Sequence, residues 1–106
     1  MAKFLIKASY TADGTKGLLK DGGSGRRKAV DKMVGGMGGK VECFYYAFGE
    51  TDVYSVIDVP DSLAAAAMSF AISSTGAVRL TMTPLLTVEE VDAACKKSVN
   101  YKAPGK

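Results

Sequence analysis

The stretch from Lys40 to Pro60 constrains the chain most, because it reads as two β-strands joined by a short loop. Runs rich in Val, Ile, Phe and Tyr flank the polar loop from Gly49 to Asp52. A short loop that holds Gly and Asp between two such runs is typical of an antiparallel hairpin. Neither run alternates cleanly between apolar and polar residues, as a strand with one wet face would. We therefore expect both faces of the hairpin to be covered and both of its strands to be central in a sheet.

A second copy of the protein is the simplest cover for the outer face of that sheet. Helices can cover one face, but a chain of 106 residues has little left for the other. We therefore expect a homodimer or a higher homo-oligomer. This length makes a single domain, which we place at residues 1–99. Residues 100–106 are polar and basic and contain Pro104-Gly105, so we interpret them as a mobile tail.

The composition is that of an ordinary folded protein, with 47% hydrophobic and 24% charged residues. The net charge of +3 comes from basic residues spread along the chain, without interleaved exposed aromatics, which argues against a nucleic-acid partner. No signal peptide and no membrane-spanning run is visible, which indicates a cytoplasmic protein without a membrane partner.

The absence of His limits the chemistry that this chain can perform. Without imidazole there is no Ser-His or Cys-His nucleophile pair. The only cysteines, Cys43 and Cys95, are too few for an ordinary zinc site, and we expect them to be reduced. We expect no metal and no cofactor, so any acid-base chemistry falls to Tyr, Asp, Glu, Lys or Cys.

The rest of the chain predicts two more strands and three helices around the hairpin. Strands are expected at residues 3–10 and 78–86. Pro84 cannot donate to a ladder, so the distal part of the second strand is expected at an edge or a bulge. Residues 11–19 are expected to hold a short helical turn, which the glycines of 21–25 interrupt, and helical spacing predicts a helix from about Ser24 to Met37. A helix over residues 63–75 is expected to pack through Leu63, Ala67 and Phe70. Thr87 and Glu90 match a capping box, which predicts a short third helix.

This order of strand, helix, strand, strand, helix and strand is the pattern of a ferredoxin-like α+β sandwich. Two helices then lie on one face of a four-stranded antiparallel sheet, and the short third helix follows at the C-terminal end. The other face stays open within one chain. We expect it to be buried against a symmetry mate, which is the arrangement of dimeric α/β barrels.

Several segments in the same order resemble the GYD family of small bacterial proteins: KASYT, GGSGRRKAVDKM, GGKVECFYYAFGETDVYSVIDVPD, TGAVRLTM and LLTVEEV. The resemblance covers the chain up to about Val91. The family is named for a Gly-Tyr-Asp motif in the hairpin, and Thr51 stands here where Tyr is common, while Gly49, Glu50 and Asp52 match. The resemblance implies a ferredoxin-like fold of the dimeric α/β barrel type and no established biochemical activity.

The glycine-rich segment before Arg26 is the best candidate for an anion site. A glycine-rich entry leaves backbone N–H groups free at a helix start, near Ser24, and Arg26 could fork onto a phosphate or carboxylate. The alternative is that Asp21, Asp31 or a carboxylate of another subunit pairs Arg26 and Arg27. The segment is not a phosphate-binding P-loop, because no Gly-x4-Gly-Lys-Ser/Thr is present.

Two charged residues on or beside the strands also have alternative interpretations. Asp52 could cap the hairpin loop through its own backbone, or act as a general base or as an ion partner of Arg79 or Arg26. Arg79 lies in an otherwise apolar strand and has to be paired or reach solvent at the rim. Either a ligand or Asp58 could be its partner.

Four tyrosines on expected strands could line a cavity for a small aromatic or anionic molecule, or fill an interface between subunits. They are Tyr10, Tyr45, Tyr46 and Tyr54.

Two functional classes remain open. The first is a non-enzymatic oligomeric module that binds a small ligand or only assembles. The alternative is a cofactor-independent monooxygenase or isomerase of the dimeric α/β barrel type, in which Tyr and Arg polarise the substrate and Asp52 or Asp58 acts as base.

Overall fold

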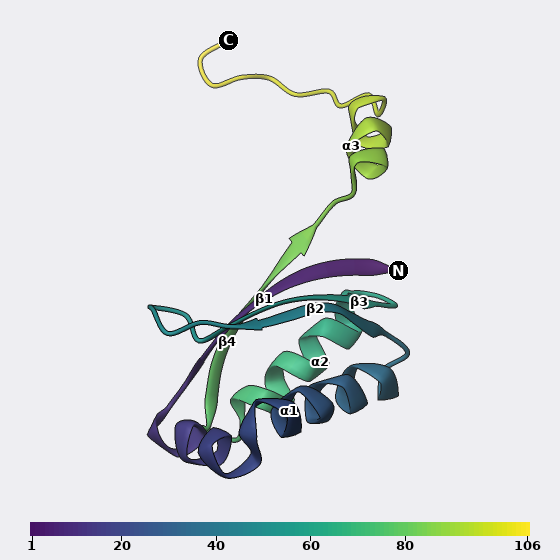
Figure 1. Cartoon of the computed structure of the whole chain (residues 1–106). Coiled ribbons are helices and arrows are strands. Elements are labelled where there is room, and N and C mark those ends of the chain that lie inside the picture. The colour runs from purple at the N-terminus through teal and green to yellow at the C-terminus, as the bar shows by residue number, and fades with distance from the viewer.

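The computed structural model describes all 106 residues, as one four-stranded antiparallel sheet and three helices. The strands lie side by side in the order β2-β3-β1-β4. Helices α1 and α2 cover one face, and α3 lies on the other side of the sheet (Figure 1). This confirms the predicted α+β, ferredoxin-like arrangement. The elements are β1 (Ala2–Tyr10), α1 (Ala12–Gly36), β2 (Lys40–Tyr46), β3 (Val53–Val59), α2 (Ser62–Ser73), β4 (Val78–Leu85) and α3 (Val88–Cys95).

The core lies between the sheet and the two helices. Every second residue of β1 points into it, namely Phe4, Ile6 and Ala8, and Phe4 lies opposite the fully buried Ile57 of β3. Helix α1 contributes Val34, which is also fully buried. Each buried Val, Ile or Phe side chain stabilises the fold by about 1.5–3 kcal/mol when it leaves water. The period of two therefore decides which residues of each strand face the helices.

The hairpin prediction needs one correction, because only β3 is central and β2 is an edge strand. On its helix side, β2 packs against α1. Phe44 lies under the guanidinium of Arg27, whose Cζ is 5.5 Å from the ring centroid, and Tyr46 packs edge-on against Phe44. A bulge between Val41 and Cys43 also breaks the period of two. An aromatic edge strand under a helix therefore resembles an inner strand in sequence.

Helix α1 is broken at Gly22, as the sequence predicts. Gly22 has φ of 74° and ψ of 168°, a backbone conformation that side chains with a Cβ rarely adopt. The second half of α1 then packs through Val30, Met33 and Val34 at helical spacing. The kink places Arg26 at the start of this half, beside the sheet end where Tyr10 lies.

The predicted packing side of α2 is wrong. Ala64, Ala65 and Met68 face the core, whereas Leu63 and Phe70 are 80% and 73% exposed. The Asp61 side chain accepts a hydrogen bond from the backbone N–H of Ala64 at 2.9 Å, which sets where the helix begins. Because the helix is apolar almost all round, no polar face in the sequence indicates its rotation about its axis.

The C-terminal part of the chain leaves the body after β4. Pro84 lies on this edge strand, as its missing N–H predicts. Helix α3 begins at the expected capping box, in which Thr87 and Glu90 bond each other's backbone N–H groups. None of the helices has the length and apolar character needed to cross a membrane.

Candidate functional site

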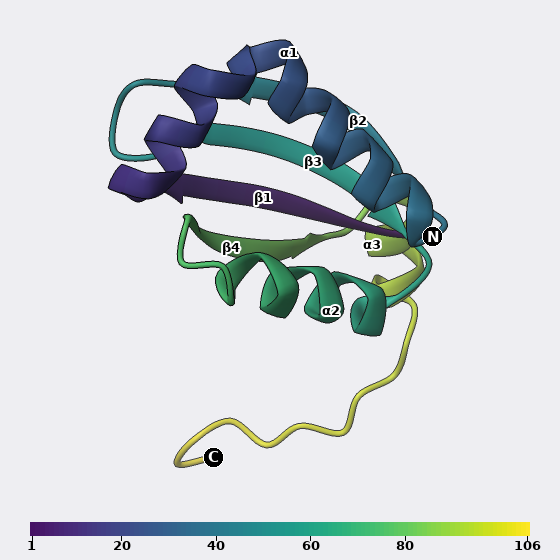
Figure 2. The same cartoon turned by 90° about the horizontal axis from the view of Figure 1, so that it is seen from below.

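An apolar groove runs between α1 and α2, with the sheet as its floor. Figure 2 shows β1 in view between the two helices, and the groove encloses a cavity of about 270 Å³. Its floor includes Ile6, Val53 and Leu80, and its walls include Met33 from α1 and Ile72 from α2. A concave, mostly apolar site with few polar groups is the usual form of a small-molecule pocket.

Small side chains on the two helices keep the groove open toward solvent. Ala29 of α1 faces Ala67 and Ala71 of α2 across a wider outer depression of about 620 Å³. Larger residues at these three positions would fill the space that separates the helices. The alanine-rich sequence of α2 thus both brings the helix close to the sheet and leaves the groove accessible.

Arg26 is the only charged residue that lines this cavity. Its Nη1 lies 3.8 Å from Oδ2 of Asp21, and this is its one ion pair within the chain. The neighbouring Arg27 is held more tightly, because its Nε donates to both carboxylate oxygens of Asp31 at 3.1 and 3.2 Å. The predicted carboxylate partners are therefore confirmed for both arginines. Arg26 nevertheless keeps most of its five N–H donors available at the groove.

Tyr10 connects the groove to a second, shallower depression of about 460 Å³ at the same end of the sheet. Tyr46 lies in this depression and donates its hydroxyl to the carbonyl oxygen of Gly23 at 2.8 Å. Burial raises the pKa of the Tyr46 hydroxyl, so this group stays a protonated donor at neutral pH. The Tyr46 hydroxyl therefore links β2 to the kink of α1 by a hydrogen bond and is not available as a base.

Asp52 anchors the hairpin loop to β1 instead of capping its own turn. One carboxylate oxygen accepts the backbone N–H of Tyr10 at 2.8 Å, and the backbone N–H of Asp52 donates to the Ala8 carbonyl at 2.9 Å. It forms no ion pair with either arginine named as a possible partner. The role of Asp52 is thus a long-range one, which holds the loop against the end of β1.

The candidate binding residues named from the sequence lie in two groups, with one residue apart from both. Tyr10, Arg26, Tyr46 and Asp52 meet on the helix side of the sheet, around the two depressions. Tyr54 and Arg79 lie on the opposite, open face, because their strand neighbours Val53 and Leu80 point into the groove. Ser24 is exposed on α1 and lines neither depression.

The open face carries its own polar depression, of about 360 Å³, at the end of the sheet near the hairpin loop. Its bases are Lys7 and Arg79, and Glu50 is the one acid that lines it. Neither base forms an ion pair within the chain. Next to it, Tyr54 lies opposite Tyr45 across β2 and β3, and both rings are exposed.

The opposite end of the open face is occupied by an ion cluster. Lys3 donates to Glu42 and, at 3.2 Å, to Oδ2 of Asp58, and these hydrogen bonds hold the pKa of the Lys3 amine above its ordinary value. Asp58 therefore pairs with Lys3, and the suggestion that it pairs with Arg79 is wrong. The second oxygen of Asp58, Oδ1, is buried without a hydrogen-bond partner.

Several residues of these sites were not found by sequence reasoning. Met33, Phe44 and Ile72 line the groove, and the sequence shows them only as ordinary apolar residues of strands and helices. Lys7 had a usable signal, because Lys3 and Lys7 share one face of β1 at a period of two. The pairing of β1 with β4 then brings Lys7 near Arg79.

The chemistry available at the groove is that of binding. Arg26 can donate to an anion, and Tyr10 offers an aromatic ring and a hydroxyl at the mouth. The remaining lining, together with the aliphatic stem of the arginine, is hydrophobic. No group of three or more His, Cys, Asp or Glu side chains is arranged to hold a metal ion.

The comparisons with known proteins agree with this fold. The model of one family, described as the GYD domain, matches residues 4–95, which span every strand and helix from β1 to α3. No curated protein and no solved structure matches the chain. A match over this much of the chain shows that the protein belongs to the GYD domain family.

Proposed function

We propose that this protein is a binding module for a small amphipathic anion, held in the groove between α1 and α2. The apolar body of the ligand, such as an aromatic or branched aliphatic group, occupies the cavity of about 270 Å³. Its carboxylate or phosphate end lies at the mouth, where Arg26 donates to it. The size of the cavity favours a molecule at the lower end of those that ordinary ligand pockets hold.

The observation that carries this proposal is a single charged side chain at the edge of an otherwise hydrophobic cavity. The Arg26 side chain is 32% exposed, and its only ion pair, with Asp21, is long at 3.8 Å. A bidentate contact to a carboxylate would be shorter and stronger than this pair. The groove therefore offers both the apolar contact area and the unsaturated cation that an amphipathic anion requires.

A cofactor-independent enzyme of the same fold has less support. Its general base would be Asp52 or Asp58, but Asp52 accepts a backbone N–H and Asp58 is paired with Lys3. A base has to be free to reach the proton that it removes. Binding without catalysis requires neither carboxylate.

Binding is tested by measuring thermal shift and calorimetric affinity for a series of aromatic and branched carboxylic acids, each beside its uncharged amide. We expect the acids to bind more tightly than the amides. Arg26→Gln is expected to weaken binding of the acids by roughly 10- to 100-fold, because a hydrogen bond to a charged group contributes about 1.5–3 kcal/mol. The affinity for the amides should change little.

Two further variants separate the groove from general charge effects. Lys28→Gln removes the same charge two residues away from a side chain that is exposed and does not line the groove, so acid binding should persist. Ala29→Phe fills the entrance and should abolish binding of acids and amides alike. Equal affinity for acids and amides, or acid binding unchanged by both Arg26→Gln and Ala29→Phe, would refute the proposal.

We also infer that the open face of the sheet is covered by a second copy of the chain. Tyr45 and Tyr54 are 68% and 41% exposed there, and Tyr is enriched in the cores of protein interfaces. Light scattering during gel filtration should give the mass of at least a dimer at micromolar concentration. A monomer under these conditions would rule this part out and leave ligand binding unaffected.

A further inference from the structure

The segment that follows β4 carries apolar side chains that are largely exposed. This C-terminal arm, residues 86–106, contains α3, and α3 has no buried residue. Figure 1 shows the arm projecting from the side of the sheet that α1 and α2 leave open. Its exposed apolar residues are Leu86, Val88, Val91, Val99 and Tyr101.

A helix of this kind needs a surface to pack on. Helix α3 spans Val88–Cys95, eight residues, and isolated helices shorter than about 12–15 residues are marginal in water. Its capping box satisfies the first backbone N–H groups but buries no apolar surface. The exposed valines on one helix therefore indicate a docking surface elsewhere.

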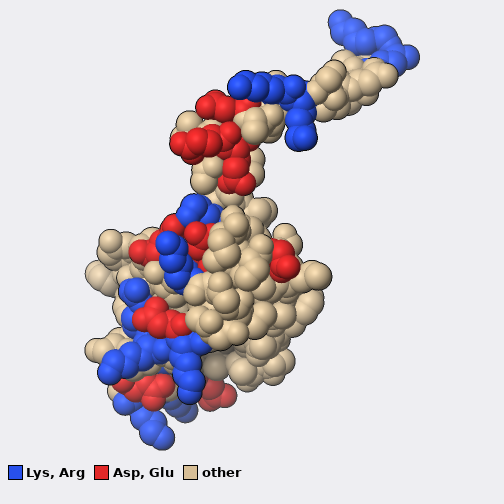
Figure 3. All heavy atoms as spheres, turned by 90° about the vertical axis from the view of Figure 1, so that its right-hand side faces the viewer, with Lys and Arg blue, Asp and Glu red and all other residues tan.

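The charges of α3 indicate which surface that is. Glu89, Glu90 and Asp92 are acidic, the last turn carries no base, and Figure 3 shows these acids gathered on the arm close to the body. The open face has the complementary charge in the depression where Lys7 and Arg79 lack an ion-pair partner. Positive and negative patches of this kind steer association and set the register of an interface.

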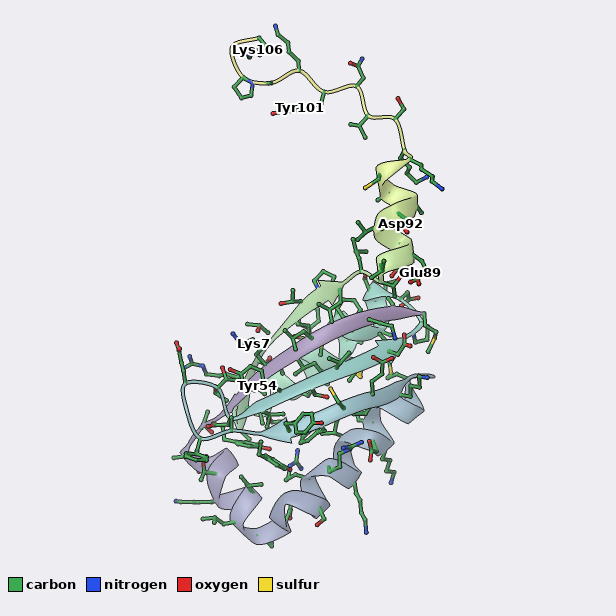
Figure 4. The ribbon with its side chains drawn as sticks, turned by 45° about the horizontal axis from the view of Figure 1, so that its top comes forward. Lys7, Tyr54, Glu89, Asp92, Tyr101 and Lys106 are labelled. Carbon is green, nitrogen blue, oxygen red and sulfur yellow. The ribbon has the colours of Figure 1, made fainter.

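A single chain does not bring these two patches together. Figure 4 shows Glu89 and Asp92 beyond one end of the sheet and Lys7, beside Tyr54, toward the other. Arg79 is six residues before Leu85, where β4 ends, and this corresponds to about 20 Å along the strand. Only Leu86 and Thr87 connect β4 to α3, and Thr87 is extended, with φ of −72° and ψ of 164°, so the chain does not turn back there.

A second copy removes this difficulty. A two-fold axis that lies between two facing sheets and perpendicular to their strands reverses the strand direction of the partner. The end of the partner's β4, and with it the partner's arm, then lies over the Lys7 and Arg79 end of the first sheet. The same operation places the first arm on the second sheet, as two-fold symmetry requires.

We propose that two copies of this chain exchange their C-terminal arms, so that the acids of α3 in each copy dock against Lys7 and Arg79 on the open face of the other. The valines of α3 then lie along the half of the face formed by β1 and β4, beside Leu5. The tyrosine pair on β2 and β3 remains for direct contact between the sheets. This inference rests on the self-association proposed above and adds the contact that holds it.

Charge reversal gives a test in which each variant is complemented by the other. The first variant carries Lys7→Glu and Arg79→Glu, and the second carries Glu89→Lys and Asp92→Lys; Glu90 is kept because it belongs to the capping box. Each variant alone juxtaposes like charges, so its dimer dissociation constant should rise at least tenfold. Mixing the two variants restores opposite charges at both contacts and should produce a heterodimer of wild-type affinity.

The measurement is the mass of each variant and of the equimolar mixture, by light scattering and by native mass spectrometry, which distinguishes the heterodimer. Lys16→Glu with Lys20→Glu is the control, because both lysines are exposed on α1, on the other side of the sheet. It should leave the dimer intact. Removal of residues 86–106 should also give a monomer.

The outcomes separate the arm from the dimer itself. If wild type is a dimer and the truncated chain still is, the sheets associate without the arm and only this inference fails. If the two variants are monomeric and their mixture also stays monomeric, the arm does not bind in trans and the inference fails. If wild type is a monomer, both the inference and the proposed self-association fail.

Discussion

The two faces of the central strand β3 differ in how fully the chain itself buries them and satisfies their hydrogen bonds. On the helix side, Val53, Ser55, Ile57 and Val59 are buried by the same chain, and even the Ser55 hydroxyl is satisfied, because it donates to the Cys43 carbonyl at 2.7 Å. On the open side the alternate residues are Tyr54, Val56 and Asp58, of which Tyr54 is exposed and Asp58 has an unpaired oxygen. The residues of the first face are buried within one chain, whereas the second face has polar and apolar groups without partners.

The helix side is not uniformly closed either. It is sealed near Val34 and Ile57, but it opens into the groove where α1 and α2 separate. Incompletely packed apolar surface therefore occurs at two places, the groove and the open face, and their chemistry differs. The groove is apolar with one cation and suits a small molecule, whereas the open face is broad and carries mixed charges that suit another protein surface.

The largest effect is expected when glycine is replaced by alanine on the packed side of α1, and the same substitution on its solvent side provides the comparison. A Cβ on Gly14 would lie 2.0 Å from the Ala77 carbonyl oxygen, so backbone has to move. Gly14→Ala should therefore lower the free energy of unfolding by about 3 kcal/mol, the upper part of the range for overpacking. Gly17→Ala has no atom within 4 Å of the new Cβ and should instead raise stability by up to about 1 kcal/mol.

Urea denaturation followed by circular dichroism measures both changes. Equal effects of the two substitutions would mean that the start of α1 does not pack against the segment before β4 as described.

The next largest effect is expected from replacing valine by alanine, once on each face of β3. Val59 is fully buried on the helix side, so Val59→Ala should destabilise the protein by roughly 1–3 kcal/mol, given about 0.5–1.5 kcal/mol for each buried methyl group. Val56 is only half-buried on the open side, so Val56→Ala should cost less in a single chain. If a second copy covers this face, the loss from Val56→Ala grows as protein concentration rises.

Denaturation midpoints at several protein concentrations provide the measurement. The effect of Val59→Ala is expected to be independent of concentration. A Val56→Ala effect as large as that of Val59→Ala, even in dilute monomer, would erase the difference between the faces.

The smallest effect lies in the arm and depends on pH. The backbone N–H of Thr87 donates to the Glu90 carboxylate at 2.8 Å, and this holds the pKa of Glu90 below its ordinary value. A carboxylate whose pKa is lowered by folding stabilises the structure above the unfolded pKa and loses that contribution as pH falls through the folded one. Helix α3 should therefore lose order as the pH falls below about 4.5, the ordinary value for Glu.

Amide chemical shifts of α3 between pH 3 and pH 7 follow this change. Glu90→Gln keeps a capping side chain but removes the charge, so it should flatten the pH dependence while α3 stays folded. A helix that loosens equally in wild type and in Glu90→Gln would show that another group is responsible.

Local signals in the sequence predicted much of the fold. The break at Gly22, the capping box at Thr87 and the edge position of Pro84 each depend on residues near one another in the chain. The packing side of α2 and the edge position of β2 could not be predicted in this way. Both depend on where α1 and the sheet come to lie, and an evenly apolar helix gives no pattern to decide its rotation.

For the candidate sites, residue types were predictable and their grouping was not. Arg26 and Tyr10 are candidates for ligand binding from the sequence, but their meeting at one groove depends on the kink of α1 and the end of β1. Asp52 was read as a local turn residue because its partner, the N–H of Tyr10, is 42 positions away in the chain. The proximity of Lys7 to Arg79 could not be predicted, because only the pairing of β1 with β4 brings the two residues together.

The sequence by itself determined the elements, their order and the GYD family, since hydrophobic period, caps and glycines act over a few residues. Only the tertiary structure decided which side chains share a face, which polar groups lack a partner, and where the helices leave a groove. The physical reason is that strand register and helix rotation are set by contacts between distant segments. One residue of slip in a strand moves every side chain to the other face.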